Sequence, residues 1–116
     1  MNQKISNIGI DIIDIKRFNK HVKNRDDKFL VNNFSESELD YCFAYKDAAT
    51  HLAGTFAAKE AVFKALGKTN ILQSAIEIKR ELNGRPTAWF KGKIHKKILV
   101  SISHTNEIAM AIAIKQ

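Results

Sequence analysis

The feature that most limits the fold of this chain is a long apolar segment at residues 47–66, which is followed by Gly67. Its apolar side chains recur every three or four positions, as the buried stripe of an α-helix requires, and they are Leu52, Phe56, Ala57, Val62, Phe63 and Leu66. A glycine in this place is typical of a helix C-terminus. We therefore expect one long helix with a single buried stripe, which the rest of the fold has to cover.

The residues before this helix predict a strand with one polar face. Isoleucines alternate with other residues across positions 5–15, which is the period of a β-strand. Successive strand side chains point to opposite sides, so one face carries Asn7, Gly9 and Asp11. A glycine inside a strand often marks the close approach of a backbone or a ligand, which makes Asp11 beside it a candidate functional residue. The alternative is an ordinary polar residue that faces solvent.

Short helices are expected between this strand and the long helix. Asp14 is placed to cap a helix that begins near Lys16, and we interpret residues 16–34 as two short helical pieces. The sequence Ser-Glu-Ser-Glu at 35–38 matches a capping box and predicts a further helix. That helix is expected to bury Leu39, Cys42 and Phe43.

After Gly67 the sequence pattern changes to that of β-structure. Strands are expected at residues 75–80, 87–90, 98–103 and 108–114, with a turn at Asn83-Gly84-Arg85-Pro86. The last two strands are expected to form a hairpin. We therefore predict a single α+β domain over residues 1–116, in which an antiparallel sheet packs against the long helix.

The charge of the chain favours an anionic partner. Lysine and arginine number 19 against 12 aspartates and glutamates, which gives a formal net charge of +7. This balance suits nucleic acid, an acidic protein, a membrane surface or a phosphorylated cofactor, and the alternative is an ordinary lysine-rich surface. Cys42 is the only cysteine, so no intrachain disulfide can form. Because no signal peptide and no membrane-spanning stretch is recognisable, a soluble cytoplasmic protein is expected.

Two charged residues of the long helix form a second candidate site. Glu60 and Lys64 are four residues apart, so they share one face of the helix. Alanines and phenylalanines flank them, which indicates that the pair borders a buried surface. A carboxylate there can bind Mg²⁺, and an ammonium can meet phosphate oxygens. The alternative is a surface ion pair, which contributes little to stability.

The strand end Ser101-Ile102-Ser103-His104-Thr105 is the third candidate. It lacks the Gly-x-Ser-x-Gly elbow, and no recognisable triad order accompanies it, which argues against a serine hydrolase. A histidine at a strand end can bind or orient a phosphate, and the alternative is a turn with satisfied hydroxyls. The four histidines of the chain have no zinc-ligand spacing.

Three motifs in this order resemble the holo-acyl-carrier-protein synthase family. They are Ile-Gly-Ile-Asp-Ile at 8–12, Phe-Ala-Ala-Lys-Glu-Ala-x-x-Lys-Ala-Leu-Gly at 56–67, and Ser-Ile-Ser-His-Thr at 101–105. The middle motif is highly specific, and the segments at 34–42 and 83–86 also look like those of the family. The resemblance implies an α+β 4′-phosphopantetheinyl transferase that assembles as a homotrimer, with active sites in the clefts between subunits.

The resemblance also implies a reaction. The enzyme would move 4′-phosphopantetheine from coenzyme A to a serine of an apo-acyl-carrier protein, release 3′,5′-ADP, and so support fatty acid and lipid biosynthesis. Carried over by position, Asp11 and Glu60 would hold Mg²⁺ together with the coenzyme A pyrophosphate. The expected catalytic residues are Glu60, Lys64 and His104. Either Glu60 or a metal-bound water would take the proton of the serine hydroxyl.

Further residues are expected to bind the two substrates. Lys64 would neutralise phosphate charge as 3′,5′-ADP leaves, and His104 would contact the cofactor phosphates. The turn Asn83-Gly84-Arg85-Pro86 is expected to take part in binding coenzyme A. Arg17 matches a position that meets the acidic recognition helix of the carrier protein.

The chain departs from the family pattern at three places. Thr55 stands where family members usually carry an arginine that touches cofactor phosphate, and the expected substitutes are Arg85, Lys59 or His51. Lys68-Thr69-Asn70 replaces a glycine-rich turn after the Ala-Leu-Gly segment. The stretch between residues 86 and 100 is short, so a helix usual there is expected to shrink to about 93–98.

Two other functions fit parts of the sequence. A small nucleic-acid-binding domain suits the charge, but it predicts aromatics interleaved with lysines on a sheet face, and only Trp89 and Phe90 beside Lys91 fit. A subunit that keeps the fold without catalysis is the other, although all the charged motif residues are present. We therefore expect an enzyme that binds neither nucleic acid nor membrane.

Overall fold

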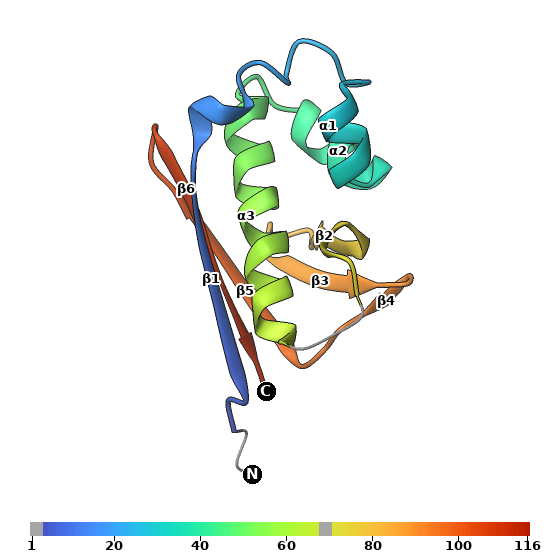
Figure 1. The fold of residues 1–116 in the computed structure, drawn as a ribbon, viewed down its shortest axis with the longest axis vertical. Coiled ribbons are helices and arrows are strands. Elements are labelled where there is room, and N and C mark those ends of the chain that lie inside the picture. The colour runs from blue at the N-terminus through green and yellow to red at the C-terminus, as the bar shows by residue number, and fades with distance from the viewer. Residues whose placement is uncertain (1–3, 68–70) are drawn as a thin grey trace.

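The long helix expected from the sequence is α3, Ala48–Leu66, and it lies at the centre of the fold (Figure 1). The computed structural model describes residues 4–67 and 71–116, so the departure expected at residues 68–70 lies outside the described residues. Gly67 follows the helix with a φ of 73°, a left-handed value that favours glycine. Every residue from 52 to 59 is buried. The expectation of a single buried stripe is therefore wrong, because neighbouring elements cover the helix on more than one side.

The first sheet has three antiparallel strands in the order β1-β6-β5. They are β1 Asn7–Asp14, β5 Ile98–His104 and β6 Ile108–Lys115. On the inner face of β6, which packs against α3, three successive positions are alanines: Ala109, Ala111 and Ala113, each at most 1% exposed. Small side chains let the helix and the sheet approach closely. The predicted hairpin of the last two strands is confirmed.

The outer face of this sheet is apolar and exposed. Ile8, Ile10 and Ile12 of β1 are 55%, 51% and 62% exposed. In the register of the sheet they pair with Ile114, Ile112 and Met110 of β6. The face shared by Asn7, Gly9 and Asp11 turns the other way, towards α3, as the close approach of Gly9 to that helix requires.

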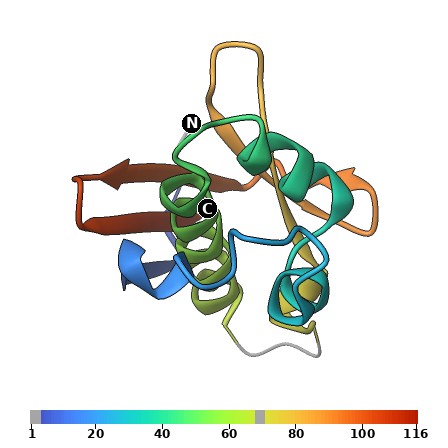
Figure 2. The same cartoon turned by 90° about the horizontal axis from the view of Figure 1, so that it is seen from above.

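The second sheet is smaller and is also antiparallel, in the order β2-β3-β4. Its strands are β2 Ile76–Arg80, β3 Pro86–Phe90 and β4 Lys93–Ile94. The helix expected near residues 93–98 is wrong, because Lys91 and Gly92 take positive φ values and turn the chain straight into β4. Seen along the long axis, α3 stands between this sheet and the first (Figure 2).

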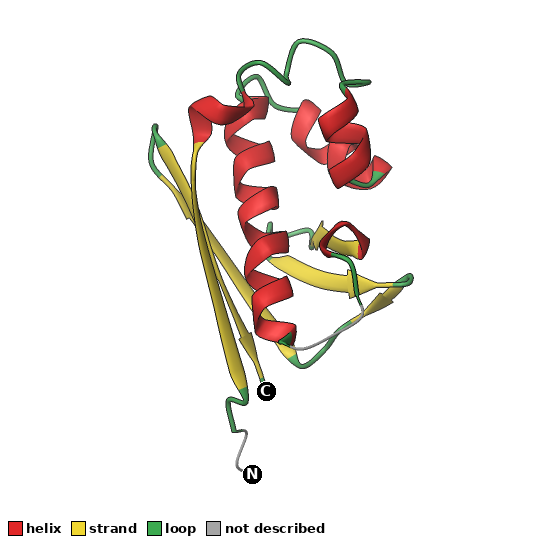
Figure 3. Cartoon of the chain, in the orientation of Figure 1, coloured by secondary structure: helices red, strands yellow, loops and turns green. Residues whose placement is uncertain are grey.

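The short helices gather at one end of α3 and above the second sheet (Figure 3). They are η1 Ile15–Phe18, α1 Lys28–Asn33, α2 Glu36–Phe43 and η2 Gln73–Ala75. The capping box of α2 is present as expected, with Leu39 and Cys42 buried and Phe43 only partly buried. Asp14 precedes η1 as expected, but its side chain makes no capping hydrogen bond.

The predicted α+β class, with antiparallel β-structure on a long helix, is confirmed. The difference is that the strands form two sheets, not one. A single cluster of buried apolar residues runs from Ile13 in β1 to Ala113 in β6 and joins both sheets to α3. Within residues 4–67 and 71–116, no helix is both long and apolar enough to cross a membrane.

Candidate active site

Asp11, Glu60 and Lys64 come together where β1 crosses α3. Gly9 makes this contact possible, since a Cβ there would lie 1.9 Å from the carbonyl oxygen of Ala61 in the helix. The backbones can therefore approach until Lys64 Nζ donates to the carbonyl oxygen of Ile10 at 2.9 Å. The same ammonium lies 3.5 Å from Asp11 Oδ1. The structure thus brings together two of the three sequence motifs.

Opposing electrostatic influences act on Glu60 in this cluster. Partial burial, together with the charge of Asp11, raises the pKa of the Glu60 carboxyl, while Lys64 and Arg17 oppose that rise. A carboxylate that is costly to ionise is stabilised by any cation that joins it. Asp11 and Glu60 are of the ligand type that Mg²⁺ prefers.

The described residues supply only part of a metal coordination sphere. In residues 4–67 and 71–116 no group of three or more His, Cys, Asp or Glu side chains is placed to hold an ion. Mg²⁺ usually binds one or two carboxylates and completes its octahedron with water and substrate phosphates. Two carboxylates beside a half-exposed lysine therefore fit Mg²⁺ bound together with a phosphorylated substrate.

A second group of expected site residues surrounds a separate cavity of about 190 Å³. Its lining includes His104 at the end of β5, together with Gly84 and Pro86 of the turn between β2 and β3. The other lining residues are Tyr41, Thr50, His51, Gly54, Arg80 and Ile102. His104 Nδ1 is 3.1 Å from the carbonyl oxygen of Thr105, which leaves Nε2 available to a ligand.

Asn83 and Arg85 lie in the same turn but outside the cavity lining. Asn83 Oδ1 accepts a hydrogen bond of 3.0 Å from the backbone N–H of Arg85, which holds the turn in shape. Both side chains are exposed. A ligand in the cavity would therefore meet Gly84 and Pro86 first.

The two groups lie at opposite edges of one sheet. Asp11 belongs to the edge strand β1 and His104 to the edge strand β5, with β6 between them. Adjacent strands are about 4.8 Å apart, so the two edge backbones are separated by roughly 10 Å. Within one chain the structure does not bring His104 to the Asp11–Glu60–Lys64 cluster.

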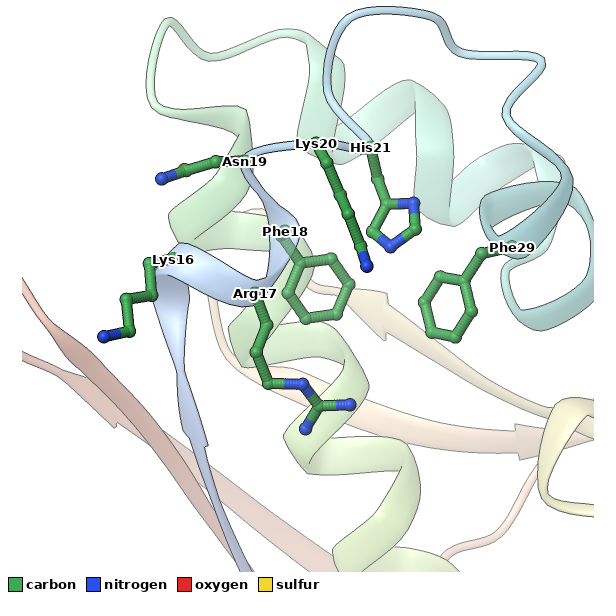
Figure 4. Close-up of a pocket in the computed structure, with 7 residues that line it drawn as sticks. All are labelled: Lys16, Arg17, Phe18, Asn19, Lys20, His21 and Phe29. Carbon is green, nitrogen blue, oxygen red and sulfur yellow. The ribbon is translucent and has the colours of Figure 1, made fainter.

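Arg17 lies in η1 beside the first group and also lines a large basic cavity (Figure 4). That cavity measures about 610 Å³ and is lined by Lys16, Arg17, Phe18, Asn19, Lys20, His21 and Phe29. The charge of Arg17 reaches Glu60 and opposes, without cancelling, the rise in the pKa of that carboxyl. Arg17 thus connects a basic surface with the carboxylate cluster.

A buried ion pair was not expected from the sequence. Lys59 Nζ donates to Glu38 Oε1 at 2.7 Å, and both side chains are fully buried. Glu38 Oε2 also accepts a hydrogen bond of 2.7 Å from the backbone N–H of Ile78. The pair ties α2 and β2 to α3, so Lys59 is a structural residue and its expected role as a substitute phosphate ligand is wrong. Only the capping motif at Glu38 signalled this residue in the sequence.

The comparison with known families decides the relationship. The family model of the 4′-phosphopantetheinyl transferase superfamily matches residues 7–113. The chain belongs to this superfamily.

Individual members of the superfamily match nearly the whole chain. The holo-acyl-carrier-protein synthase of Thermodesulfovibrio yellowstonii is 38% identical over 95% of this chain and 97% of its own length. The crystal structure of a holo-acyl-carrier-protein synthase from Bacillus anthracis, in complex with CoA (3′,5′-ADP), covers 96% of both chains at 31% identity and a TM-score of 0.79. That from Helicobacter pylori, in complex with coenzyme A, covers 94% of this chain and 99% of its own at 32% identity and a TM-score of 0.77.

These relationships confirm the predicted family and activity. The chain is a phosphopantetheinyl transferase of the holo-acyl-carrier-protein synthase type. The α+β fold expected from the three motifs matches the solved transferases. The roles of individual residues stay predictions and are argued next.

Proposed function

We propose that this enzyme uses Asp11, Glu60 and Lys64 to transfer 4′-phosphopantetheine from coenzyme A to a serine of an apo-acyl-carrier protein. The products are holo-carrier protein and 3′,5′-ADP, which places the chain in fatty acid and lipid biosynthesis. The observation that carries the proposal is the meeting of two carboxylates and a lysine at the crossing of β1 and α3. The similar enzymes from Bacillus anthracis and Helicobacter pylori were solved with coenzyme A or its 3′,5′-ADP part, which supports the choice of donor.

The bonding changes in the transfer are simple. The serine oxygen of the carrier forms a bond to the phosphorus next to pantetheine, the bridge to the second phosphate breaks, and 3′,5′-ADP leaves. The serine proton has to go to a base. Glu60 is proposed for this role, because its carboxylate lies in the cluster that would meet the pyrophosphate. Lys64, half exposed beside Asp11, is placed to meet the charge that develops on the leaving phosphate.

Mg²⁺ is proposed as the cofactor, held by Asp11 and Glu60. When bound there, the ion would neutralise phosphate charge and polarise the phosphorus. The fit rests on the chemistry of the donors, since two hard carboxylates that repel each other are stabilised by a divalent cation.

The Cys42 thiol offers no alternative nucleophile, because burial raises its pKa to about 11.

A homotrimer is proposed to complete the site. The group around His104 and the group around Asp11 lie at opposite edges of one sheet, so a neighbouring copy can supply the edge that each group lacks. The apolar outer face of that sheet needs a cover as well, since exposed apolar patches of this kind mark interfaces. The sequence makes Ile102, Ile112 and Ile114 candidates for the trimer interface. Ile112 and Ile114 lie on this outer face, whereas Ile102 faces the opposite way, next to Gly54 of α3, so it is withdrawn as a candidate.

The carrier protein is proposed to dock on the basic surface around Arg17. Lys16 and Lys20 flank Arg17 at the same cavity, and the net charge of +7 favours an acidic partner. Because Arg17 also lies close enough to influence Glu60, a carrier bound there would deliver its serine to the carboxylate cluster.

We place this single transferase domain, residues 1–116, in the cytoplasm, where its free buried thiol suits a reducing compartment.

The direct test is a transfer assay. The protein is incubated with Mg²⁺, coenzyme A and an apo-acyl-carrier protein, and the carrier is weighed by mass spectrometry. We expect the carrier to gain the mass of one phosphopantetheine, and we expect its KM to rise with salt as charges are screened over about 8 Å at physiological ionic strength. The absence of any mass gain on a competent apo carrier would overturn the proposed function. A KM independent of salt would overturn the docking surface alone.

A further inference from the structure

Arg80 is a half-buried guanidinium without an acidic partner. It lies at the end of β2, and its guanidinium lies over the ring of Tyr41, with 4.4 Å between the guanidinium carbon and the ring centroid. Its Nη1 donates to Thr55 Oγ1 at 3.3 Å. Across residues 4–67 and 71–116, no carboxylate lies within ion-pair distance of it. A guanidinium has five N–H donors and stays charged, so most of its binding capacity is unused.

Arg80 points into the cavity that holds His104. The walls on either side are backbone or small groups: Gly54 of α3, Gly84 with a φ of 88°, and Pro86. Around Gly84 the space is open, since a Cβ built there would meet nothing within 4 Å. His51 lines the same cavity and is held by stacking on Tyr45. Cationic and polar groups thus converge on a space with room for an anion.

We propose that Arg80 binds the 3′-phosphate of coenzyme A in this cavity. The inference rests on the proposed function and identifies one residue of its donor site. Coenzyme A carries phosphate at two places, the pyrophosphate and the 3′-phosphate. The pyrophosphate is where the transfer occurs, so it belongs with Asp11, Glu60 and Lys64 at the β1 edge. The 3′-phosphate is the remaining anion, and the cavity at the β5 edge is the remaining cationic site.

The environment of Thr55 explains why this arginine comes from β2. Thr55 is fully buried, and its hydroxyl accepts a hydrogen bond from Arg80. A small residue at position 55 leaves the space into which the longer side chain of Arg80 extends. Of the substitutes expected from the sequence, Lys59 is paired with Glu38, and Arg85 lies outside the cavity lining. No local sequence motif marks Arg80, because its neighbour Thr55 is distant in the chain.

The test compares coenzyme A with 3′-dephospho-coenzyme A as donors. For each donor we would measure both the calorimetric Kd and the KM in the transfer assay. The wild-type protein should bind coenzyme A more tightly than 3′-dephospho-coenzyme A. Arg80→Gln should raise the Kd for coenzyme A about 10- to 100-fold and leave the Kd for the dephospho donor nearly unchanged. Arg80→Lys should recover only part of the difference, because it keeps the charge and loses the planar fork.

Lys79→Gln is the matched control. Lys79 directly precedes Arg80 in β2, and its ammonium lies over the ring of Trp89, outside the cavity lining. Its replacement by glutamine removes the same charge as Arg80→Gln. This variant should keep the wild-type preference for coenzyme A. The inference is overturned if Arg80→Gln weakens both donors equally, if Lys79→Gln behaves like it, or if the wild type does not distinguish the donors. A wild type that binds both donors but transfers nothing would contradict the proposed function, and the ratio of Kd values would still decide the role of Arg80.

Discussion

Glu60 is the residue in which opposing electrostatic influences meet. Partial burial and the neighbouring Asp11 disfavour its charge, whereas Lys64 and Arg17 favour it, and the outcome is a raised pKa. Without a cation, the ionised Glu60 carboxylate lowers the stability of the folded protein. With a cation bound, the same carboxylate is stabilised, so the charge that lowers the stability of the apo protein is the one that function requires.

Glu60→Gln should separate these two effects. The folded protein binds the Glu60 proton more tightly than the unfolded chain does, so ionisation lowers stability as the pH rises above the ordinary value of 4.5. Without metal, Glu60→Gln should therefore melt at a slightly higher temperature than the wild type at pH 7, and the difference should vanish below pH of about 4. Turnover should fall at least about 100-fold. Thermal melting at several pH values, alongside the transfer assay, measures both.

Mg²⁺ and a second glutamate provide the controls for this prediction. Mg²⁺ should raise the melting temperature of the wild type and leave Glu60→Gln almost unchanged. Hydrogen bonds from Ser35 and Ser37 outweigh the effect of burial and lower the pKa of Glu77. Glu77→Gln should therefore lower the stability at pH 7, and this loss should disappear when the pH falls below the pKa of Glu77 in the folded protein. Equal Mg²⁺ stabilisation of the wild type and Glu60→Gln would show that Glu60 is no ligand.

The contact between β1 and α3 is the element-scale feature on which the site depends. Gly9 brings the strand against the helix backbone, and this contact sets Asp11 beside Glu60. The buried alanines of β6 let the neighbouring strand pack against the same helix. The geometry of the carboxylate cluster is thus a consequence of small residues that carry no chemistry.

Gly9→Ala should damage both stability and catalysis. The added Cβ would lie 1.9 Å from the carbonyl oxygen of Ala61, and a backbone atom cannot move aside cheaply. We expect a loss of about 3 kcal/mol in the free energy of unfolding, measured by urea denaturation. Gly54→Ala is the comparison, since its Cβ would meet only a methyl group of Ile102 at 3.1 Å, and it should cost less. Equal stability of Gly9→Ala and the wild type would refute this close contact.

The elements themselves could be predicted from local patterns in the sequence. The long helix, the capping box of α2 and the final hairpin all follow from periodicity and turn residues. The orientation of β1 could not, because alternation defines two faces without telling which one meets the helix. The isoleucines, the more apolar face, turn outward, since only the face of Gly9 can approach α3 so closely.

At the scale of the whole molecule, the expected site residues fall into two groups. Local motifs identified Asp11, Glu60 and His104, but the sequence does not show that β6 separates the first from the last. Nor does the sequence show the contact of Arg80 with Thr55 or the ion pair of Lys59 with Glu38, because the residues of each contact lie far apart along the chain. One chain therefore holds two separate groups of expected site residues, and we propose that copies join them through the exposed isoleucine face.

The central claim, that two copies share each active site, is tested most directly by mixing two defective proteins. Glu60→Gln removes the β1-edge half and His104→Ala removes the β5-edge half, so each alone should be nearly inactive. Co-expressed with different tags and purified as mixed trimers, they should recover about a third of wild-type activity, because one of the three interfaces in each mixed trimer pairs an intact β1 edge with an intact β5 edge. Mixed oligomers that form but show no activity beyond that of the separate variants would contradict the claim.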